Sequence, residues 1–542
     1  MSLAADAIVI GGGPGGATAA TMLARKGLRV LLLERERFPR AHVGESLLPA
    51  SLPILEELGA LPAVRAEGFV EKWGATMVWG SGDEPWSWYF RETSQRHPHS
   101  YQVWRPRFDE LLLDNARASG VDVREGHRVH EVVFEQGAAR GVRYSDPDGV
   151  SALAMASFVV DASGQTALLG TELELRRWDP FFRNLAVYAY FSGAERLPPP
   201  DQGNIFIESY EHGWLWHIPL HTGQSSVGAV VDRARAQGRV RGSGPAEFLS
   251  SQIAQAPRTS AMLAGARRES GPFVVRDWSY RSDRLVGDGY ILVGDAACFV
   301  DPLFSSGVHL ALSSGVLAAA YVTSALRDAS LREPAAEAYT RLYTTQYEHF
   351  YQLAKLFYSS NRSCDSYFWE ARRLVDEDES FSPRQAFVRA VAGQPPQGYE
   401  RAVLERGVAP PLFRRNVSAV ESARASRAAR FARMAGDPTG PAGVVPRLAP
   451  GLRVERAPVL GEGEFVWGDV IRCPERSDEV PCSPLVKVML SLADGRRSLG
   501  EIAARLSEGA DPSQHERIAG LIVESARVLY VDGLIAELGG EA

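Results

Sequence analysis

The stretch that decides the fold lies near the start of the chain, where residues 8–16 read Ile-Val-Ile-Gly-Gly-Gly-Pro-Gly-Gly. A short apolar run ends there in a turn that satisfies G-x-G-x-x-G, with Gly11, Gly13 and Gly16 in the required places. Apolar residues then recur at helical spacing, and residues 30–33 form a second apolar run. This order predicts strand, turn, helix and strand, which is the βαβ unit of a Rossmann-like domain.

The same unit carries the pattern of a dinucleotide site. Pro14 and Gly15 complete a turn whose backbone can approach a pyrophosphate at the start of a helix. Glu34 and then Arg35 follow the second apolar run, at the position where a carboxylate can accept a hydrogen bond from a ribose 2′-hydroxyl. Because Glu34 would repel a 2′-phosphate, the pattern favours FAD or NAD over NADP.

A second turn of the strand-to-helix type reads Gly294-Asp295-Ala-Ala and precedes Pro302 and Gly307. The Asp295 carboxylate can bind the ribityl chain of a flavin, and the amides that follow can face its pyrophosphate or its ring system. Asp161 ends another short apolar run, which predicts a further strand of the same domain. These separated elements favour FAD as the cofactor.

With these elements, the N-terminal two thirds of the chain resembles the FAD-dependent monooxygenases and halogenases of the para-hydroxybenzoate hydroxylase fold. Arg105-Pro-Arg-Phe-Asp109 is similar to a pattern of that family, and the resemblance implies that Arg105 lies near the flavin. A surface ion pair is the alternative for this arginine. Glu45 and Ser46, in Gly-Glu-Ser-Leu-Leu-Pro, are shared with the geranylgeranyl-reductase branch and do not separate the activities.

Residues 214–219 read Trp-Leu-Trp-His-Ile-Pro. Alternation along a strand places Trp214, Trp216 and Ile218 on one face, with Pro219 at its end. This W-x-W-x-I-P pattern resembles the motif of flavin-dependent halogenases, which implies a wall that keeps the organic substrate away from the flavin so that halide reacts there. The alternative is a sheet with two core tryptophans.

Lys72 stands in Val70-Glu-Lys-Trp-Gly, ahead of an apolar run. The same resemblance implies that it lies between flavin and substrate, where its ammonium can hydrogen-bond hypohalous acid or its amine can be halogenated. A solvated surface lysine is the alternative. Burial would lower the pKa of Lys72 and make its amine form accessible.

Composition excludes several classes of protein. The 542 residues carry 59 Lys and Arg against 66 Asp and Glu, a net charge of -7 that offers no footprint for nucleic acid. Only four cysteines occur, which favours a cytoplasmic location, and the Cys473 and Cys482 pair lacks nearby histidines, so we expect no metal site. The apolar stretch at 307–326 contains polar residues and predicts a core helix, so we expect no membrane segment.

The predicted fold class is mixed α/β, with a Rossmann-like FAD-binding domain, an antiparallel sheet on the substrate side, a helical C-terminal extension and a small winged-helix-like terminal unit. The predicted boundaries are 1–335 for the core (nucleotide-binding segments about 1–170 and 286–335, sheet about 171–285), 336–436 for the extension, 437–455 for a linker and 456–542 for the terminal module.

The resemblance implies an enzyme that uses reduced FAD, oxygen and chloride or bromide to halogenate an electron-rich aromatic ring. We expect a phenolic or pyrrolic substrate, free or tethered to a carrier protein, and hypohalous acid relayed to Lys72. No second G-x-G-x-x-G motif is present for a nicotinamide, which favours a separate flavin reductase. The alternatives are an aromatic hydroxylase, an isoprenoid-chain reductase and a flavin-binding scaffold.

Carrier docking has a candidate surface in an arginine-rich helix predicted at 415–433. Arg415, Arg424, Arg427 and Arg430 would attract an acidic partner there. A solvated helix face paired with the excess carboxylates is the alternative.

Overall fold

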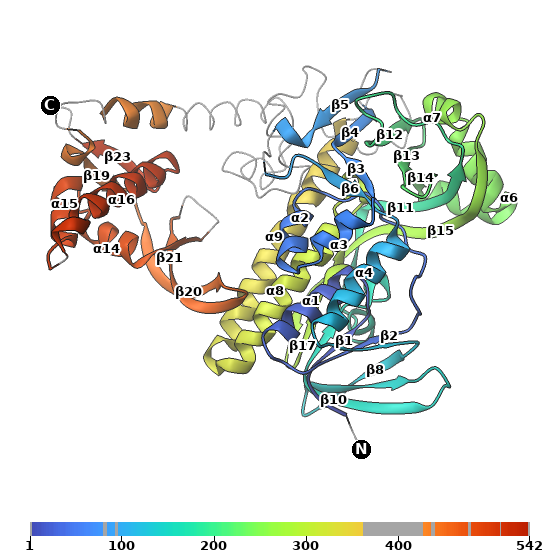
Figure 1. The fold of residues 1–542 in the computed structure, drawn as a ribbon, viewed down its shortest axis with the longest axis horizontal. Helices are drawn as coiled ribbons and strands as arrows, with labels where there is room; N and C mark the ends of the chain where they lie inside the picture. Colours follow the sequence, from blue (N-terminus) through green and yellow to red (C-terminus); the bar gives the residue numbers. More distant parts are fainter. Residues whose placement is uncertain are drawn as a thin grey trace. The chain divides into compact units, whose positions relative to one another are not determined.

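The computed structural model describes residues 3–79, 84–92, 96–360, 426–434, 440–474, 479–509 and 511–539 (Figure 1). The chain divides into two compact units. Unit 1 comprises Met1–Arg327 and Tyr339–Pro396, and unit 2 comprises Asp328–Ala338 and Gln397–Ala542.

A mainly parallel sheet forms one end of unit 1. Its central strand β1 (Leu3–Ile10) lies between β2 (Val30–Glu34) and β10 (Ser151–Asp161). The other strands of this sheet are β7 (Asp122–Glu125), β17 (Tyr290–Leu292), β16 (Val286–Gly287), β8 (Arg128–Glu135) and β9 (Ala138–Ser145). The carboxyl ends of β1, β2, β10 and β17 meet at one edge, where a nucleotide domain places its ligand.

Three helices pack together beside this sheet: α1 (Pro14–Arg25), α4 (Arg105–Ala118) and α8 (Gly307–Arg327). The apolar face of α1 is fully buried because its small residues permit close approach to β1 and α8. Helix α8 is long and apolar enough to cross a membrane, but 89% of its apolar window is buried inside the protein. The predicted Rossmann-like domain is therefore confirmed.

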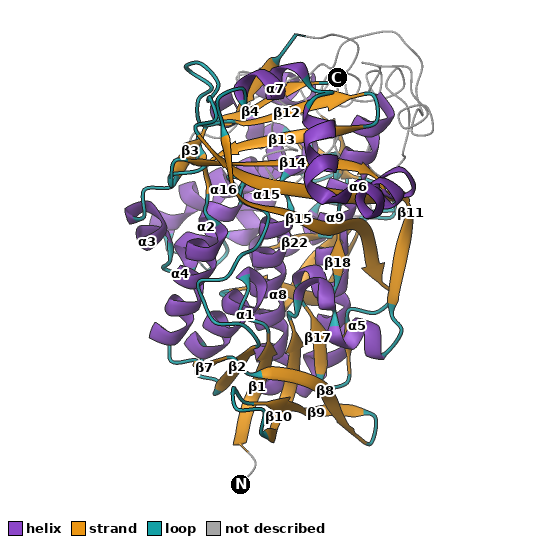
Figure 2. Cartoon of the chain, turned by 90° about the vertical axis from the view of Figure 1, so that its right-hand side faces the viewer, coloured by secondary structure: helices purple, strands orange, loops and turns teal. Residues whose placement is uncertain are grey.

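A second sheet forms the other end of unit 1 (Figure 2). It contains, in spatial order, β18 (Cys298–Phe299), β15 (Arg267–Ser282), β11 (Arg176–Ser192), β14 (Gln224–Asp232), β13 (Gly213–Pro219), β12 (Ile205–Tyr210), β4 (Gly74–Val78) and β5 (Trp86–Tyr89). Neighbouring strands are antiparallel except β12 and β4. The sheet extends beyond residues 171–285 because β4, β5 and β18 pair with its edges.

Two short strands carry the segment around Lys72. β3 (Val70–Lys72) pairs antiparallel with β6 (Ser100–Gln102), and Ser46 bridges Gln102 on the other side of β6. The long helix α9 (Arg332–Ser360) carries buried aromatic residues on one face; they include Tyr339, Tyr343, Tyr347, Phe350 and Phe357.

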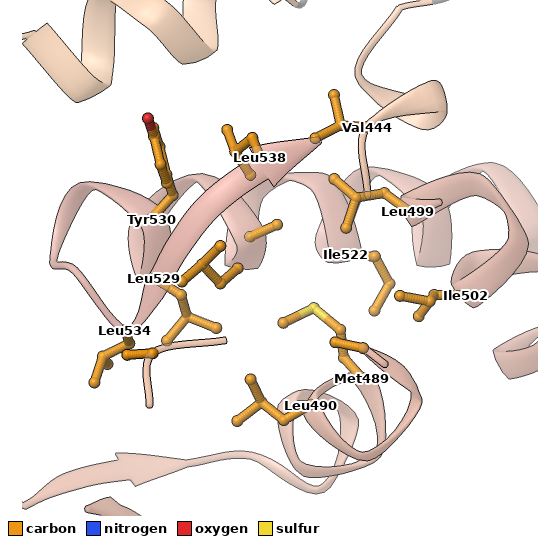
Figure 3. Close-up of a cluster of buried hydrophobic side chains, with 14 of the residues drawn as sticks. Val444, Met489, Leu490, Leu499, Ile502, Ile522, Leu529, Tyr530, Leu534 and Leu538 are labelled. Atoms are coloured by element: carbon orange, nitrogen blue, oxygen red, sulfur yellow. The ribbon is translucent and has the colours of Figure 1, made fainter. Parts of the chain in front are cut away.

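Unit 2 has its own hydrophobic core (Figure 3). Its described strands are β19 (Val445–Leu448), β20 (Arg453–Gly461), β21 (Glu464–Arg472), β22 (Val480–Cys482) and β23 (Ile535–Gly539), and its helices include α14 (Pro484–Leu492), α15 (Leu499–Leu506) and α16 (Pro512–Val531). Met489, Ile502, Ile522 and Leu529 meet at the centre. Ser498 and Glu501 form a capping box at the start of α15. Strand β19, which pairs with β23, lies in the predicted linker at 437–455.

The contact between Gly16 and the turn before it generates the first prediction. A Cβ at position 16 would stand 2.0 Å from the carbonyl oxygen of Gly11, which is backbone and cannot move aside cheaply. We expect Gly16→Ala to destabilise the protein by roughly 3 kcal/mol and to lower the melting temperature. Gly238→Ala is the matched control, because a Cβ there meets nothing within 4 Å. Equal melting temperatures for the two variants would contradict this account of the turn.

Candidate functional site

A cavity of about 620 Å³ lies within unit 1, lined by residues of both sheets and their connecting turns. The predicted site residues that line it are Gly11, Gly13, Pro14, Gly15, Glu34, Arg35, Glu45, Ser46, Arg105, Trp214, Trp216, Ile218, Gly294, Asp295, Pro302 and Gly307. The cavity lining does not include Gly16, Asp161, Lys72 or Pro219, all of which the structure describes. The cavity thus brings together the residues of the predicted FAD site and those of the tryptophan motif.

One end of the cavity suits a pyrophosphate. Gly11 has a φ of +100°, and a Cβ there would stand 2.5 Å from the carbonyl oxygen of Ala162, so only glycine permits this turn. A Cβ at Gly13 would stand 3.3 Å from Nη2 of Arg40, which places a guanidinium over the turn at the start of α1. Sequence reasoning missed Arg40, because no local motif marks it.

Glu34 is held in place at the end of β2. Its Oε2 accepts a hydrogen bond of 2.7 Å from the Gly12 amide, and its Oε1 accepts one of 2.8 Å from the Glu36 amide. Each carboxylate oxygen can accept more than one hydrogen bond, so Glu34 can still accept one from a ribose hydroxyl. The neighbouring Arg35 lies at the exposed rim, where Nη1 donates to Oγ1 of Thr166 at 3.4 Å.

Asp295 faces the cavity from the turn after β17. Burial raises the pKa of its carboxyl group to about 6, against the opposing effect of Arg105. The hydroxyl of Tyr280 donates to its backbone carbonyl at 2.6 Å, but no donor among the described residues bonds its carboxylate. A hydroxyl-bearing ligand such as the ribityl chain would supply that donor, so the cavity fits FAD at this point.

The Arg105 guanidinium makes its hydrogen bonds to other groups of the protein. Its guanidinium binds both oxygens of Asp109, at 2.8 and 2.9 Å, and donates to the carbonyl of Val43 at 2.5 Å. It is therefore a buried ion pair that fixes the segment before Glu45. The Glu45 carboxylate accepts a hydrogen bond of 2.7 Å from the Tyr190 hydroxyl, which anchors the same segment to the second sheet.

Asp161 lies behind the cavity. Its two carboxylate oxygens accept backbone hydrogen bonds from Ser163 at 3.0 Å and Leu169 at 2.8 Å. The position of Asp161 at the end of a strand of the nucleotide domain assigns it to the cofactor-binding residues; in the structure its carboxylate holds the loop at 162–166, whose residues line the cavity. Any effect of Asp161 on a ligand would therefore act through that loop.

The tryptophan motif forms the wall of the cavity. Trp214 and Trp216 are 1% and 5% exposed, and their ring centroids lie 6.1 Å apart. The Trp216 ring lies against Gly228, where a Cβ would come within 2.2 Å of it. Trp216 Nε1 donates to Oγ of Ser226 at 3.2 Å, and Tyr188 packs beside it. The wall is therefore rigid, because both packing and hydrogen bonding hold it.

A buried network holds the other indole. Trp214 Nε1 donates to the Tyr358 hydroxyl at 2.6 Å, and that hydroxyl donates to Oδ2 of Asp301 at 2.8 Å. Asn184 donates to the same Asp301 oxygen at 3.0 Å. Asp301 precedes Pro302, so the wall and the turn at Pro302 are coupled. Sequence reasoning missed these residues, because no local motif marks Asn184, Asp301 or Tyr358.

Lys72 is buried outside the cavity. It is 2% exposed, its Nζ donates to the Leu47 carbonyl at 3.1 Å, and it lies 5.4 Å from the Phe90 ring centroid. Desolvation lowers its pKa to about 7. Since Leu47 follows the cavity-lining Ser46, the ammonium group stands next to the chain segment that forms the cavity wall. Both the amine and the ammonium form are accessible near neutral pH.

Two further expectations concern ions and partners. Within the described ranges, no group of three or more His, Cys, Asp or Glu residues could hold a metal ion. Arg427 is used inside unit 2, because its Nη1 donates to the carbonyls of Tyr530 at 2.8 Å and Ile535 at 3.2 Å. It is therefore not a free docking residue. Arg415 and Arg424 lie outside the described residues.

The chain matches two protein-family models and is similar to proteins named as halogenases. The family model described as tryptophan halogenase matches residues 91–406, and that of FAD dependent oxidoreductase matches residues 6–171. Tryptophan 2-halogenase of Chondromyces crocatus is 37% identical, over 68% of this chain and 71% of that protein. The 1H-pyrrole-2-carbonyl-(peptidyl-carrier protein) chlorinase of Pseudomonas fluorescens is 30% identical, over 68% of this chain and 87% of that protein.

Among solved structures, that of CmlS, a flavin-dependent halogenase, is similar over nearly the whole chain. It matches with a TM-score of 0.74 and 29% identity, covering 97% of this chain and 95% of CmlS. The similarity therefore extends to the C-terminal region as well as the nucleotide-binding sheet.

The burial of Lys72 predicts a dependence of stability on pH. Its pKa is about 7 in the folded protein, below the usual 10.5, so the unfolded chain binds the proton more tightly. Burial of the charged lysine therefore lowers the free energy of unfolding. This loss of stability is complete below pH 7 and disappears as the pH rises toward 10.5. We expect Lys72→Met to stabilise the apoprotein at pH 6 by roughly 3 kcal/mol, and by less at pH 9, in thermal unfolding. Lys487→Met, at an exposed lysine, is the control; a less stable Lys72→Met variant at pH 6 would contradict the assignment.

Proposed function

The chain belongs to the flavin-dependent halogenases, and from this we propose that it halogenates an electron-rich aromatic ring, phenolic or pyrrolic, by way of Lys72. One observation carries the proposal: a rigid tryptophan wall forms part of the cavity lining, while a buried lysine with a pKa of about 7 lies against Leu47, which follows the cavity-lining Ser46. This separation of cofactor space from lysine is what a two-stage halogenation requires.

FAD is the cofactor of this family, and in its reduced form it supplies the electrons that, with oxygen and halide, yield hypohalous acid. We propose that the start of α1 and Arg40 hold the pyrophosphate and that Glu34 binds the adenosine ribose. Asp295 would accept a hydrogen bond from the ribityl chain. The support is the cavity lining and the Asp295 carboxylate, for which no described residue supplies a donor.

The wall would exclude organic substrate from the cavity. Trp214 and Trp216 cannot swing aside without breaking hydrogen bonds to Tyr358 and Ser226, and both would leave buried N–H groups unsatisfied. A substrate ring held outside the wall cannot reach the cofactor. Such confinement favours halogenation over direct hydroxylation.

Lys72 would then take up the halogen. In its amine form, Nζ attacks the halogen of hypohalous acid, the oxygen–halogen bond breaks, and the departing hydroxide removes a proton from nitrogen to leave as water. The substrate ring attacks the halogen on nitrogen, and the nitrogen–halogen bond breaks with its electron pair going to nitrogen. The ring carbon then loses its proton, and a proton taken up by nitrogen restores the amine of Lys72. Desolvation favours the amine, because it lowers the pKa of Lys72 to about 7.

The substrate class rests on the relatives. One similar protein is named as a chlorinase of a pyrrole-2-carbonyl group on a peptidyl-carrier protein. We propose a comparable phenolic or pyrrolic substrate here, free or carrier-tethered. We also propose a separate flavin reductase, because the sequence has no second dinucleotide motif, and a cytoplasmic location, because it has only four cysteines. The division into core, extension and winged-helix-like module remains part of this proposal.

Product mass tests the reaction. With reduced FAD, oxygen, chloride and a panel of phenols and pyrroles, we expect products that have gained chlorine. We expect the Lys72→Met variant to bind FAD normally and to form at least about 100-fold less chlorinated product, because the lysine acts after the halide has been oxidised. Products that gain oxygen or lose a double bond would indicate the hydroxylase or reductase alternative. Unchanged chlorination by the variant would remove Lys72 from the reaction.

Substrate delivery is tested separately. If the ring arrives on a carrier protein, the carrier-bound acyl group should be chlorinated at least about tenfold faster than the same free acid, because docking raises its local concentration. The control is the same acyl group on a short pantetheine without protein. Equal turnover of all three forms would show that the carrier contributes nothing.

A further inference from the structure

The cavity has a polar side and an apolar side. Turns of the nucleotide-binding sheet form the polar side, which includes the carboxylates of Glu34 and Asp295. Strands of the second sheet form the apolar side, whose lining residues are Ala186, Tyr188, Ile205, Trp214, Trp216, Ile218, Val275 and Phe299. The two indole N–H groups of this side are bonded to Tyr358 and Ser226. Among the residues in this list, Tyr188 is therefore the one whose side chain can offer a polar group to the cavity.

The Tyr188 hydroxyl opens into the cavity. It has no hydrogen-bond partner among the described residues, and it retains accessible surface, unlike the hydroxyl of Tyr290, which is fully buried and unpaired. Tyr188 as a whole is only 4% exposed, and it lines the cavity from a strand inside its sheet. The surface that the hydroxyl retains therefore belongs to the cavity, where there is space for a partner.

Three aromatic neighbours hold the Tyr188 ring in place. Its centroid lies 5.1 Å from that of Phe273 on the paired strand β15 and 6.1 Å from that of Trp216. Tyr190, two residues further along β11, meets the ring edge-on at 5.9 Å. The residue opposite on β14 is Gly228, which the Trp216 ring covers. Close packing on these sides keeps the ring from turning its hydroxyl away from the cavity.

The Tyr188 hydroxyl can donate a hydrogen bond. Burial raises the pKa of Tyr188 and the Glu45 carboxylate raises it further, against the opposing effect of Arg105, so the phenol keeps its proton at neutral pH. Glu45 takes its own hydrogen bonds from the Tyr190 hydroxyl at 2.7 Å and from the Gly44 amide at 3.1 Å. The proton of Tyr188 is therefore available to an acceptor in the cavity.

The order of groups along FAD decides which of them meets Tyr188. In the proposed placement, the adenosine lies at Glu34, the pyrophosphate at the start of α1 and the ribityl chain at Asp295, all on the polar side of the cavity. The isoalloxazine ring is the remaining part of the cofactor and would lie against the apolar side. The faces of this ring are apolar, but one of its edges carries carbonyl oxygens and ring nitrogens that accept hydrogen bonds.

We propose that Tyr188 is a cofactor-binding residue whose hydroxyl donates a hydrogen bond to the polar edge of the isoalloxazine ring, an inference that rests on the proposed placement of FAD. An apolar wall by itself permits a flat ring to slide and to rotate in its own plane. A single donor at a fixed position on that wall removes this freedom, because only one orientation of the ring satisfies it. Tyr188 would thus set which edge of the ring faces the tryptophan wall.

The proposed hydrogen bond favours the reduced cofactor. Reduction leaves the ring with a negative charge near neutral pH, and its carbonyl oxygens and nitrogens share that charge. A hydrogen bond to a charged acceptor is roughly twice as strong as one to a neutral acceptor. Loss of the Tyr188 hydroxyl should therefore weaken the binding of reduced FAD more than that of oxidised FAD, and it should lower the reduction potential of the bound cofactor.

The test compares Tyr188→Phe with Tyr210→Phe in the full chain. Tyr188→Phe keeps the ring that packs against Phe273 and Trp216 and removes only the hydroxyl. Tyr210 is the matched control, because it is also 4% exposed in the second sheet, but its hydroxyl donates to Gln252 at 3.1 Å and its ring belongs to the hydrophobic cluster on the other face of that sheet.

Three properties of the bound cofactor are measured: the affinity of the apoprotein for oxidised FAD by fluorescence quenching, the absorption spectrum, and the reduction potential. We expect Tyr188→Phe to bind oxidised FAD about threefold more weakly and reduced FAD about tenfold more weakly, with a shifted absorption spectrum. We expect Tyr210→Phe to match the wild type in all three. Melting temperatures of the apoproteins check that both variants are folded.

Wild-type affinity, spectrum and potential in Tyr188→Phe would overturn the inference. Equal losses in both variants would also overturn it, because they would trace the effect to the packing of the sheet. A change in chlorination alone, with the three cofactor properties unchanged, would assign the hydroxyl to another ligand and would likewise overturn it. A wild-type chain that binds no FAD would instead overturn the proposed function on which the inference rests.

Discussion

Backbone pairing between residues 45–47 and β6 is the interaction on which the rest of unit 1 depends. The Leu47 amide donates to the carbonyl of Tyr101 at 2.9 Å, and the Val103 amide donates to that of Glu45 at 2.7 Å. This short segment places Glu45 and Ser46 in the cavity and presents the Leu47 carbonyl to Lys72. The geometry of cofactor space and the geometry of the lysine are thus set by one set of hydrogen bonds, and a shift in either would move the other.

The cavity and the surroundings of Lys72 differ in the partners that they offer to charged side chains. In the cavity, Arg105 is paired with Asp109 and Glu34 is held by backbone amides, whereas the Asp295 carboxylate has no donor among the described residues. Among the described residues, Lys72 has the Leu47 carbonyl as its hydrogen-bond partner and lies against the Phe90 ring, and these contacts do not offset its desolvation. Such a residue lowers stability at neutral pH, and apolar residues of similar length would pack there at less cost. A destabilising buried amine is typical of sites retained for chemistry.

The features that could be predicted from the sequence are those that a short stretch of chain determines by itself. The turn at Gly11 and the positions of Glu34 and Asp295 follow from strand-to-helix patterns, and the wall follows from alternation along β13. Contacts between distant segments were not predictable, because nothing near Arg40 or Tyr358 in the sequence indicates the register that brings them to the site. For the same reason the sequence assigns Asp161 to the cofactor and Arg427 to a docking partner. In the structure, Asp161 accepts hydrogen bonds from backbone amides, and Arg427 donates to a backbone carbonyl.

The chemistry of the wall also constrains the order of events in the proposed reaction. Moving an ion past two buried indoles would remove it from water without replacing its hydrogen bonds, at a cost of many kcal/mol. A neutral acid of a few atoms loses far less solvation on the same path. Halide would therefore have to be oxidised on the cavity side and cross as the neutral acid. The amine form of Lys72, which desolvation makes accessible near neutral pH, would then take up the halogen, and the loss of the acid in that step would keep it from returning to the cavity.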